Sequence, residues 1–568
     1  MILSNDNIYT GHKAQMLRLD EKTQVEEPFL NQLQGLGWNV LRLEMQGQKP
    51  EDSYRTSFSE VVLIPELRKS LKAINSFLSE SQLDDVIRKI TSFNKNSLIE
   101  NNQQVLEYFL QGTTVTLNEQ TGELSPTVRF IDYDNPGNNS FLAISQFKIN
   151  IPGTENHIVP DIVIFINGLP VVVVECKSLK IKDATAEAIE QLLRYSEQRG
   201  ATGEGNQSLF FYNQFVITTN RSEARFGTIT THIEKLFYRW SDPYPLTLND
   251  LDSKGTSPND QQRIVAGMLS KNNLLDLIQT FTIFTVTDEG ETIKVVARYQ
   301  QYKAVKKTVK RLLEGKNKDD RSGIIWHTQG SGKSLTMMFM VREMRQKPSL
   351  MGWKIVFITD RTQLEKQLSE TSQGIGFTVK KADSINKLKE LIAAESSDLV
   401  MAMIHKFQER DFDVLFPVLN TSDKILTMTD EAHRSQYSLL GANLDRSMPN
   451  ATRIAYTGTP IDKTEKTYGD YIDKYTMRSS IDDGVTLEIV YEGRTHNSEI
   501  PDSEGLDKRF QDVFADYNPD EKTEILGYGA KRAYMEAAET IKDKAADMIK
   551  HYVKFIFPNG FKAQVVAC

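Results

Sequence analysis

Cysteine is scarce in this sequence, and long apolar runs are missing. Only Cys176 and Cys568 occur among 568 residues, which excludes a disulfide framework and a zinc site built from cysteines. The longest apolar stretches, 162–166 and 169–174, are far shorter than the ~20 residues of a membrane span. The first residues also lack the basic and apolar segments of a secretory signal. We therefore expect a cytoplasmic protein that makes no membrane contact.

An overall excess of positive charge is absent as well. The chain has 68 Lys and Arg against 76 Asp and Glu, a formal charge of −8, which excludes a wholly basic, histone-like nucleic-acid binder. A local basic channel for DNA remains compatible with this charge. Basic residues gather at 301–321, where a solvated helix face is the expected explanation. Acidic residues gather at 497–521, which we expect to be an exposed connection between domains.

The length and the residue pattern predict a multidomain α/β protein. At roughly 150 residues per domain, the chain is long enough for about three or four domains. Residues 242–263 are rich in Pro, Asp, Asn, Ser and Gly, as in a linker. Beyond them, strand-like runs alternate with helical patterns, which predicts a parallel sheet covered by helices. These runs are 323–326, 354–359, 399–403, 425–429 and 453–457.

A glycine-rich loop follows the first of these strands. Between Thr328 and Ser334, small residues precede a helical pattern, so backbone N–H groups can surround phosphate oxygens at a helix N-terminus. Lys333 would reach the β- and γ-phosphates, and the Ser334 hydroxyl would bind Mg²⁺. His327 stands where the strict phosphate-loop pattern has glycine, and the alternative is an ordinary glycine-rich turn. The candidate nucleotide-binding residues are Thr328, Gly330, Ser331, Gly332, Lys333 and Ser334.

Two carboxylates follow another of the predicted strands. Asp430 and Glu431 would lie at the carboxyl edge of the sheet, where nucleotides bind. Asp430 would hold Mg²⁺ through water, and Glu431 would orient or deprotonate the attacking water. An acidic pair after a strand is commonly a helix N-cap, but Lys333 in the same chain favours a nucleotide site. A third strand ends in a hydroxyl-rich turn with Thr457 and Thr459, beside the same edge.

Together these blocks resemble motifs I, II and III of superfamily 2 helicases and translocases. Residues 360–364 resemble motif Ia, which touches the nucleic-acid backbone in that family, and Gln301 resembles its adenine-reading glutamine. The resemblance implies a RecA-like lobe that binds and hydrolyses ATP.

A second candidate site lies nearer the N-terminus. Residues 159–177 predict a β-hairpin that turns at 167–168. Its carboxylates, Asp161 and Glu175, can bind Mg²⁺ if they share a face, and Lys177 beside them can position the attacking water. By spacing alone, a Glu–Lys surface pair is the commoner explanation.

The register of this hairpin decides between the two explanations. A two-residue loop would put Asp161 opposite Val174, on the face away from Glu175. A three-residue loop, or an equivalent bulge, would put Asp161 opposite Val173 and on the same face as Glu175 and Lys177. We predict the second arrangement.

The hairpin resembles the Pro-Asp…Glu-x-Lys nuclease core, in the version carried by the R (restriction) subunit of type I restriction enzymes. Gln191 and Tyr195 match an additional Gln-x-x-x-Tyr motif of that family. Four residues apart in a helix, they share a face and could approach DNA or the metal together. Glu26 matches a helical acidic position of the same core, with Glu27 as the adjacent alternative. The resemblance implies catalytic roles for Asp161, Glu175, Lys177, Glu26, Gln191 and Tyr195.

Further blocks at 54–63, 131–136, 139–141 and 430–436 follow the R-subunit order, so the resemblance runs from about residue 20 to the end. It implies Mg²⁺-dependent cleavage of double-stranded DNA, combined with ATP-driven translocation. It also implies partners, the M (methyltransferase) and S (specificity) subunits, with S-adenosylmethionine bound to the methyltransferase rather than to this chain. DNA contacts of this chain would then be mainly to phosphates.

We expect a PD-(D/E)xK-type nuclease domain at 1–250, a first RecA-like lobe at 251–470, and a connection with the incomplete start of a second lobe at 471–568. Motifs IV to VI of that second lobe are not found, so we expect a piece of a longer polypeptide. The alternative function is a superfamily 2 translocase or repair helicase whose N-terminal domain binds DNA without cutting. A non-enzymatic assembly subunit fits less well, as does a type III restriction subunit, in which the nuclease follows the motor.

Overall fold

The computed structural model describes residues 20–252, 255–287, 289–359, 378–409, 415–431, 439–460, 462–488 and 538–564. The chain forms two compact units, Met1–Leu487 and Glu488–Cys568. The expected motif at 360–364 and the acidic segment at 497–521 lie outside the described residues. No helix within the described ranges is both long and apolar enough to cross a membrane. The smaller unit contains α21 (Ala538–His551), η7 (Tyr552–Ile556) and η8 (Phe557–Asn559).

The first sheet of the larger unit has six strands of mixed direction. In spatial order they are β1 (Asn39–Leu41), β4 (Phe141–Ser145), β7 (Ile162–Ile166), β8 (Leu169–Cys176), β9 (Phe215–Thr219) and β10 (Ala224–Gly227). β7 and β8 form the predicted hairpin, and both are buried along their whole length because apolar side chains occupy both faces. β8 pairs in parallel with β9, and α6 (Ala184–Tyr195) makes the crossover between them.

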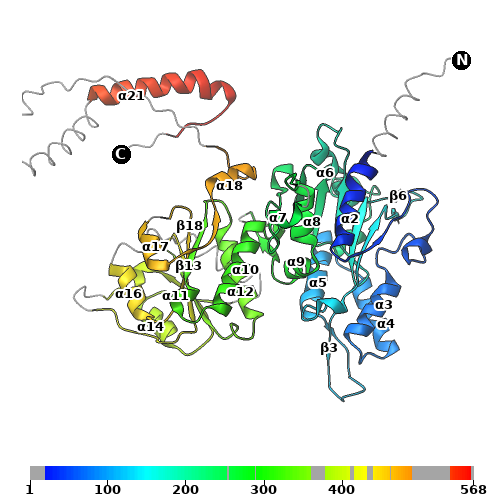
Figure 1. Ribbon diagram of the computed structural model, residues 1–568, viewed down its shortest axis with the longest axis horizontal. Helices are drawn as coiled ribbons and strands as arrows, with labels where there is room; N and C mark the ends of the chain where they lie inside the picture. Colours follow the sequence, from blue (N-terminus) through cyan, green and yellow to red (C-terminus); the bar gives the residue numbers. More distant parts are fainter. Residues whose placement is uncertain are drawn as a thin grey trace, which may run out of the picture. The chain divides into compact units, whose positions relative to one another are not determined.

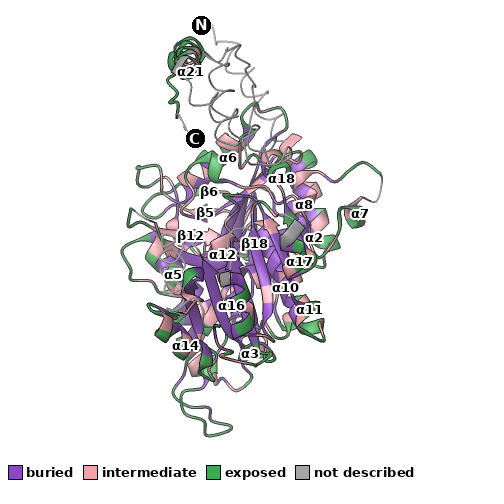
Figure 2. Ribbon diagram, turned by 90° about the vertical axis from the view of Figure 1, so that its left-hand side faces the viewer, coloured by how far each residue is buried: buried purple, intermediate pink, exposed green. Residues whose placement is uncertain are grey.

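Helices from earlier in the chain pack with this sheet. They are η1 (Lys22–Glu26), α2 (Glu27–Gly35), α3 (Ile64–Ile74), α4 (Glu80–Thr91) and α5 (Leu98–Gln111). Each α-helix buries an apolar stripe; in α2 the stripe is Phe29, Leu30 and Leu33, whose helical spacing fits a core-facing surface. Figure 2 shows buried strands, with exposed residues on the outer sides of the helices.

A helical segment and a hairpin lead from the first sheet to the second. They are α7 (Leu248–Leu251), α8 (Asp260–Leu269), α9 (Lys271–Gln279), β11 (Thr282–Val286) and β12 (Thr292–Val296). The expected linker at 242–263 is therefore only partly irregular, because it contains α7 and the start of α8. α8 packs on α2, and the Trp38 indole donates to the Leu269 carbonyl at 2.8 Å.

The second sheet has seven strands, and every neighbouring pair is parallel. All five predicted strands are present, and the predicted α/β fold class is confirmed (Figure 1). The two edge strands, β15 and β19, were not predicted from the sequence, and β19 extends this sheet past residue 470. In spatial order the strands are β15 (Val379–Lys381), β16 (Leu399–Met403), β14 (Lys354–Thr359), β17 (Ile425–Asp430), β18 (Thr452–Thr457), β13 (Gly323–His327) and β19 (Tyr471–Tyr475).

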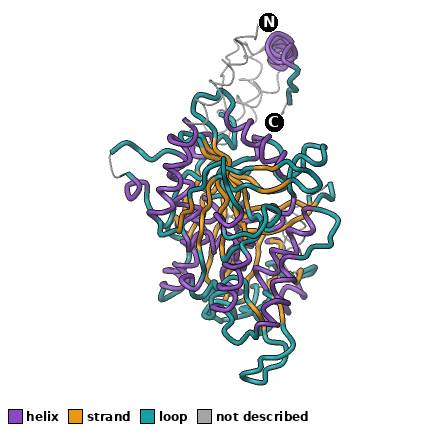
Figure 3. Tube along the Cα trace, turned by 90° about the vertical axis from the view of Figure 1, so that its right-hand side faces the viewer, coloured by secondary structure: helices purple, strands orange, loops and turns teal. Residues whose placement is uncertain are grey.

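Alternate residues of β14, an inner strand of this sheet, face two different helix layers. Ile355 and Phe357 belong to the core that includes α10 (Tyr299–Glu314) and α12 (Lys333–Arg345). Val356 and Ile358 belong to the core that includes α14 (Ile385–Ala393) and α16 (Leu439–Ser447). Figure 3 shows the strands running between helices, as a doubly covered parallel sheet requires.

The basic cluster on α10 is not the simple solvated face that we expected. Lys303, Lys306 and Lys307 are half-buried and pair with carboxylates from other elements, whereas Lys310 is exposed and pairs with Glu314 of the same helix. Lys306 lies 2.7 Å from Asp276, and Lys307 lies 3.0 Å from Asp473. These pairs hold α10 against its neighbours, so the cluster gives no direct indication of nucleic-acid binding.

Candidate active sites

A β-bulge sets the register of the β7–β8 hairpin. The turn is a two-residue loop, Asn167-Gly168, in which both residues have positive φ, 53° and 80°. The pairing then shifts by one residue, so Val171 of β8 has no partner on β7. The bulge that we predicted as an alternative is confirmed, and the three-residue loop is wrong. The buried Asn167 amide fixes the turn by donating to the Phe130 carbonyl at 2.8 Å.

Because of this bulge, the predicted hairpin residues share one face. Continuing the observed pairing, Asp161 comes opposite Glu175, and Lys177 follows two residues later on the same face. The prediction that Asp161 faces Val173 is wrong, whereas the shared face is the predicted one. Asp161 Oδ2 accepts a 2.7 Å hydrogen bond from the Cys176 backbone N–H. All of these side chains are buried.

Two further carboxylates approach from the N-terminal helix. Glu21, Glu26 and Asp161 each have a carboxylate oxygen that lies within 4.8 Å of the other two. Gln146, just after β4, bridges two of them: its amide donates to Glu26 Oε1 at 3.0 Å and to Asp161 Oδ1 at 3.3 Å. Of the adjacent pair left open by the sequence, Glu26 faces the site and is 3% exposed, whereas Glu27 pairs with an arginine outside it.

Glu21 was not identified from the sequence. It lies five positions before Glu26, and an α-helix would place two such residues about 140° apart around its axis. The turn between them is the π-helix η1, whose wider i→i+5 turn brings residues five apart to the same side. Asp20 holds the start of this turn by accepting a 2.5 Å hydrogen bond from Ser178, just beyond β8. The only sequence feature that could have indicated Glu21 is its spacing of five from Glu26. That spacing predicts a shared side only if the turn between them is already known to be a π-helix.

Burial disfavours the charged forms of these acids. Burial and the neighbouring Asp161 carboxylate raise the pKa of Glu21 to about 7 and that of Glu26 to about 8. Burial also raises the pKa of Asp161 and, together with the Asp161 carboxylate, raises the pKa of Glu175. Burial opposes the charge on Lys177, but Glu175 and Asp161 outweigh it and raise the pKa of the ammonium. These acids outnumber the lysine, so an added cation would relieve their mutual repulsion.

Gln191 and Tyr195 reach this site from α6. Lys177 Nζ donates to Glu175 Oε1 at 2.9 Å and to Gln191 Oε1 at 2.8 Å. The Gln191 amide donates in turn to the Tyr195 hydroxyl at 2.5 Å, and that hydroxyl donates to the Val159 carbonyl at 3.1 Å. Tyr195 is 2% exposed, so the pair faces the lysine of the site, and Tyr195 offers little surface to DNA.

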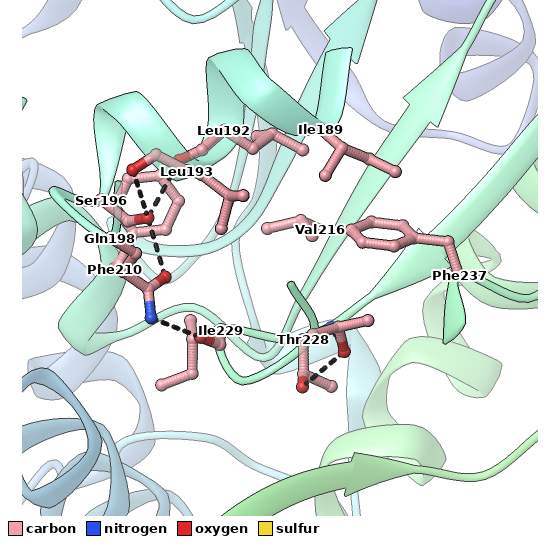
Figure 4. A pocket seen from close by; sticks show the side chains of 11 residues that line it. Ile189, Leu192, Leu193, Ser196, Gln198, Phe210, Val216, Thr228, Ile229 and Phe237 are labelled. Atoms are coloured by element: carbon pink, nitrogen blue, oxygen red, sulfur yellow. Dashed lines mark hydrogen bonds between the residues drawn. The ribbon is translucent and has the colours of Figure 1, made fainter. Parts of the chain in front are cut away.

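The buried face of α6 belongs to the core. Figure 4 shows Ile189, Leu192 and Leu193 directed toward Val216 of β9 and Phe237. The cavity between them has a volume of about 10 Å³, at the lower limit of what one buried water needs, and far too small for a ligand. This cavity is a packing gap, so the chemistry of α6 rests on its Gln-x-x-x-Tyr pair.

The nuclease-like site fits a hard divalent cation. Its donor set consists of carboxylate oxygens, which Mg²⁺ prefers. Glu175 Oε2 is buried and receives no hydrogen bond from the described residues, although a buried carboxylate oxygen is costly to leave unsatisfied. A cation at this position would satisfy Glu175 Oε2 and favour the ionised forms of Glu21, Glu26 and Asp161.

The second site lies at the carboxyl edge of the parallel sheet. The phosphate loop joins β13 to α12, and Lys333 is the first residue of α12. Its ammonium lies 3.8 Å from Glu431 Oε1 and 3.4 Å from the His327 carbonyl. Asp430 ends β17 and is buried; Glu431 follows with φ +46°, a conformation that costs a non-glycine residue about 1–3 kcal/mol and is typical of functional sites.

The adenine-reading candidate contacts the phosphate loop. Gln301 donates from its amide to the Gly332 carbonyl at 3.0 Å, and Arg298 donates to the Gly330 carbonyl at 3.1 Å. Gly332 has φ +84°, and a Cβ there would lie 2.5 Å from the Gln301 amide nitrogen. The glycine is therefore required both by its backbone conformation and by the close approach of Gln301.

The remaining nucleotide-site candidates surround the same loop. Thr457 ends β18 and accepts a 3.2 Å hydrogen bond from the Thr459 backbone N–H. The Thr328 N–H donates to the Tyr475 carbonyl of β19 at 2.9 Å. Ser331 is buried in the loop, and Ser334 is the second residue of α12. All the candidate nucleotide-binding residues therefore lie in or beside the loop at one sheet edge.

His327 replaces the expected loop glycine without disturbing the strand. It is the last residue of β13 and is fully buried. Its Nε2 lies 3.1 Å from Asp473 Oδ2 of β19, so the imidazole packs inside the sheet edge and not in the phosphate loop. This explains why the position tolerates a side chain.

Comparison with known proteins separates the same two regions. Residues 18–235 match the family "Type I restriction enzyme R protein N terminus", and residues 300–523 match the SWI2/SNF2 ATPase family. The type I restriction enzyme HindI endonuclease subunit of Haemophilus influenzae is 30% identical over 564 residues, covering 94% of this chain and 51% of that protein. The putative type I restriction enzyme MjaIXP endonuclease subunit of Methanocaldococcus jannaschii is 28% identical over 582 residues, covering 98% and 54%.

The chain spans about half the length of the curated relatives it matches. Among solved structures, a nuclease-deletion mutant of the type ISP restriction-modification enzyme LlaGI, in complex with a DNA substrate mimic, matches 39% of this chain and 22% of that chain. Its identity is 14% and the TM-score is 0.26, too low to define the fold. The sequence matches confirm the family resemblance that the motifs indicate.

Proposed function

We propose that this chain, which joins the N-terminal domain of type I restriction enzyme R proteins to a SWI2/SNF2 ATPase domain, is the nuclease and motor part of a type I restriction endonuclease subunit. It cleaves double-stranded DNA with Mg²⁺ and moves along DNA by hydrolysing ATP. The observation that carries this proposal is the hairpin register, in which the bulge at Val171 puts Asp161 opposite Glu175, beside Lys177 and Glu26.

In the nuclease, each side chain has a separate task. Asp161, Glu175 and the carboxylates of the N-terminal helix would hold Mg²⁺, which supplies charge stabilisation and lowers the pKa of attacking water. Lys177 would orient that water and stabilise negative charge on the scissile phosphate. Gln191 accepts a hydrogen bond from Lys177 and Tyr195 fixes Gln191, so the ammonium is held in place before DNA arrives.

In the motor, the phosphate loop would bind Mg-ATP. Lys333 would contact the β- and γ-phosphates, while Ser334 and Asp430 would hold Mg²⁺. Glu431, held 3.8 Å from Lys333, would orient or deprotonate the water that attacks the γ-phosphate. The hydroxyls at the end of β18 lie beside the loop and would respond to the presence of the γ-phosphate.

The proposed setting is a cytoplasmic complex with M and S subunits. S-adenosylmethionine would serve the methyltransferase, and the specificity subunit would read the DNA sequence. Contacts of this chain to DNA would then be mainly to phosphates, and its DNA affinity would fall steeply with salt.

The decisive experiment reconstitutes the R subunit with its M and S partners on unmethylated circular plasmid and follows ATP hydrolysis and linearisation together. Asp161→Ala should abolish cutting and leave ATP turnover near the wild-type rate, because Asp161 belongs only to the nuclease site. Lys333→Ala is the matched control and should abolish both, because the motor brings the complex to its cleavage position.

A superfamily 2 translocase with a DNA-binding but non-cutting N-terminal domain predicts a different outcome. In that case Asp161→Ala would cut no less than the wild type, and any DNA binding by the N-terminal domain would not require Mg²⁺. Glu175 Oε2, which is buried and accepts no hydrogen bond from the described residues, favours the nuclease proposal. Such an oxygen lowers stability, and a domain that only binds DNA would have no functional reason to keep it.

A further inference from the structure

The β11–β12 hairpin contacts, through buried polar groups, two elements that lead to the two candidate sites. It follows α9 directly and pairs Phe284 with Lys294. Its first strand contacts α12, the helix that begins with Lys333, and its second strand contacts Asn213 and Gln214, which lead into the strand beside Glu175. No sequence motif indicated this element, because its residues are ordinary for a short hairpin.

On the nuclease side, Lys294 inserts its side chain into the first domain. It is 3% exposed, and its ammonium donates to three neutral oxygens. These are Asn102 Oδ1 at 2.7 Å, the Asn213 carbonyl at 2.7 Å and Gln214 Oε1 at 3.1 Å. The three donors of the ammonium are therefore all used, and it forms no ion pair with a carboxylate of the described residues. Burial lowers the pKa of Lys294, so its ammonium depends on these three oxygens for stabilisation and tolerates little displacement.

Asn213 and Gln214, which accept hydrogen bonds from Lys294, lie next to the bulge. Gln214 donates its backbone N–H to the Val171 carbonyl at 2.7 Å, and Val171 is the extra residue that sets the hairpin register. Gln214 also leads directly into β9, which pairs Thr218 with Glu175. A shift of Lys294 would therefore act on the segment that fixes where Glu175 lies.

On the motor side, α12 holds the start of the hairpin. Arg342 donates to the Thr282 carbonyl at 2.8 Å and to the Gln279 carbonyl at 2.7 Å. The next residue, Glu343, accepts a 3.1 Å hydrogen bond from the Thr280 hydroxyl. Arg342 and Glu343 are both buried, so a movement of α12 has to move the residues just before β11.

We propose that Lys294 is a positioning residue for the nuclease, and that the β11–β12 hairpin makes the geometry around Glu175 depend on the nucleotide bound at α12. This inference rests on the proposed function and adds a route by which the motor controls cutting. Binding of Mg-ATP would stabilise the position of α12. Through Arg342, α12 would then fix the position of β11, and through Lys294 the hairpin would fix the Gln214–Val171 contact.

The test compares Lys294→Met with Thr292→Val. Methionine keeps the length of the lysine side chain but has no N–H donors, whereas Thr292 lies on the same strand and makes none of these contacts. Amide hydrogen exchange of the full chain is measured with and without Mg²⁺ and a non-hydrolysable ATP analogue. In the wild type and in Thr292→Val, the analogue should slow exchange at 213–219 by about tenfold, within the usual range of coupling between sites.

Lys294→Met should still bind the analogue, with an affinity within about twofold of the wild type, but should lose the slowing at 213–219. In the complex with M and S subunits, it should cut plasmid about tenfold more slowly while hydrolysing ATP at the wild-type rate. A purely structural role would lower both activities together.

Two results would overturn the inference: no effect of the analogue at 213–219 in the wild type, or an unchanged effect in Lys294→Met. If Lys294→Met does not fold, Arg342→Gln interrupts the same connection from the motor side and should give the same loss. The exchange measurement needs no DNA cleavage, so it can fail while Asp161→Ala still abolishes cutting. The proposed nuclease function and the proposed coupling through the β11–β12 hairpin are therefore tested independently.

Discussion

Glu21 and Glu26 lie five residues apart in one helix, and both carboxylates approach Asp161 because the turn between them is a π-helix. A regular α-helix would direct one of the two away from the site. The wide turn thus adds an acid to a site that the hairpin alone would leave with Asp161 and Glu175.

The first prediction concerns the cation affinity of this site. Glu21→Gln should raise the Mg²⁺ concentration for half-maximal DNA cleavage by about tenfold, because one charged oxygen donor is lost. Glu27→Gln is the matched control, since Glu27 is on the same helix but pairs with Arg42, 3.0 Å away. A Mg²⁺ titration of plasmid cutting measures both. Equal titration curves for Glu21→Gln and the wild type would remove Glu21 from the site.

The second prediction concerns pH without added divalent cations. The folded-state pKa values of Glu21 and Glu26 are about 7 and about 8, above the ordinary value of 4.5. The folded protein therefore holds protons that the unfolded chain releases, so these acids favour folding at low pH and lose that effect as pH rises through about 8. The free energy of unfolding of the wild type should fall more steeply with pH than that of Glu26→Gln.

Urea unfolding at pH values between about 5 and 9 measures this difference. Mg²⁺ should weaken the pH dependence above about pH 7, because binding requires the ionised acids. Parallel pH profiles for the wild type and Glu26→Gln would show that Glu26 is not protonated in the folded state.

The third prediction separates backbone strain from steric contact in the hairpin turn. Gly168 and Gly153 both have positive φ, but a Cβ at Gly168 would lie 2.6 Å from the Leu63 carbonyl, and one at Gly153 would meet nothing within 4 Å. Gly153→Ala should lower the free energy of unfolding by about 1–2 kcal/mol, the usual cost of this conformation. Gly168→Ala should cost about 1–3 kcal/mol more, through overpacking against α3. Thermal or urea unfolding checks this, and equal losses would contradict it.

The fourth prediction tests the contact between Gln301 and the phosphate loop. Gln301→Ala should weaken binding of a fluorescent ATP analogue by about tenfold, because the phosphate loop loses its hydrogen bond to α10, and the donors that remain on the Gly332 carbonyl both come from Thr336 of α12. Gln300→Ala is the control: Gln300 is also buried, but its amide nitrogen has no partner in the described structure. A larger effect for Gln300→Ala than for Gln301→Ala would reverse the assignment.

Much of both sites could be predicted from the sequence because their residues follow strands. The spacing of Asp161, Glu175 and Lys177 limits the possible registers to two, and the chemistry chooses between them. The five inner strands of the parallel sheet were likewise recognisable from their apolar runs. The edge strands β15 and β19 were not, because half-covered strands carry charged and aromatic residues that resemble loops.

What the sequence could not reveal depends on backbone details or distant pairing. Glu21 needs a π-helix, for which no residue preference is known here, and Gln146 needs the pairing of β4 with β7. Lys294 reads as a surface lysine in its own strand and becomes buried only when the hairpin meets α5. The predicted three-residue loop of the hairpin was wrong for the same reason, because the extra residue lies within β8 and not in the turn.

Val171 itself carries no reactive group, and yet the pairing of Asp161 with Glu175, the two acids that we propose to be catalytic, depends on its presence. What natural selection must keep at this position is the number of residues between Asp161 and Glu175, rather than the identity of any one of them. Apolar substitutions at Val171 should leave the proposed nuclease site intact. Deletion of one residue between Leu169 and Val174 would leave all the sequence motifs recognisable. It would nevertheless place Asp161 and Glu175 on opposite faces of the hairpin. If the proposed function is right, gene copies with such a deletion would encode a motor without a nuclease.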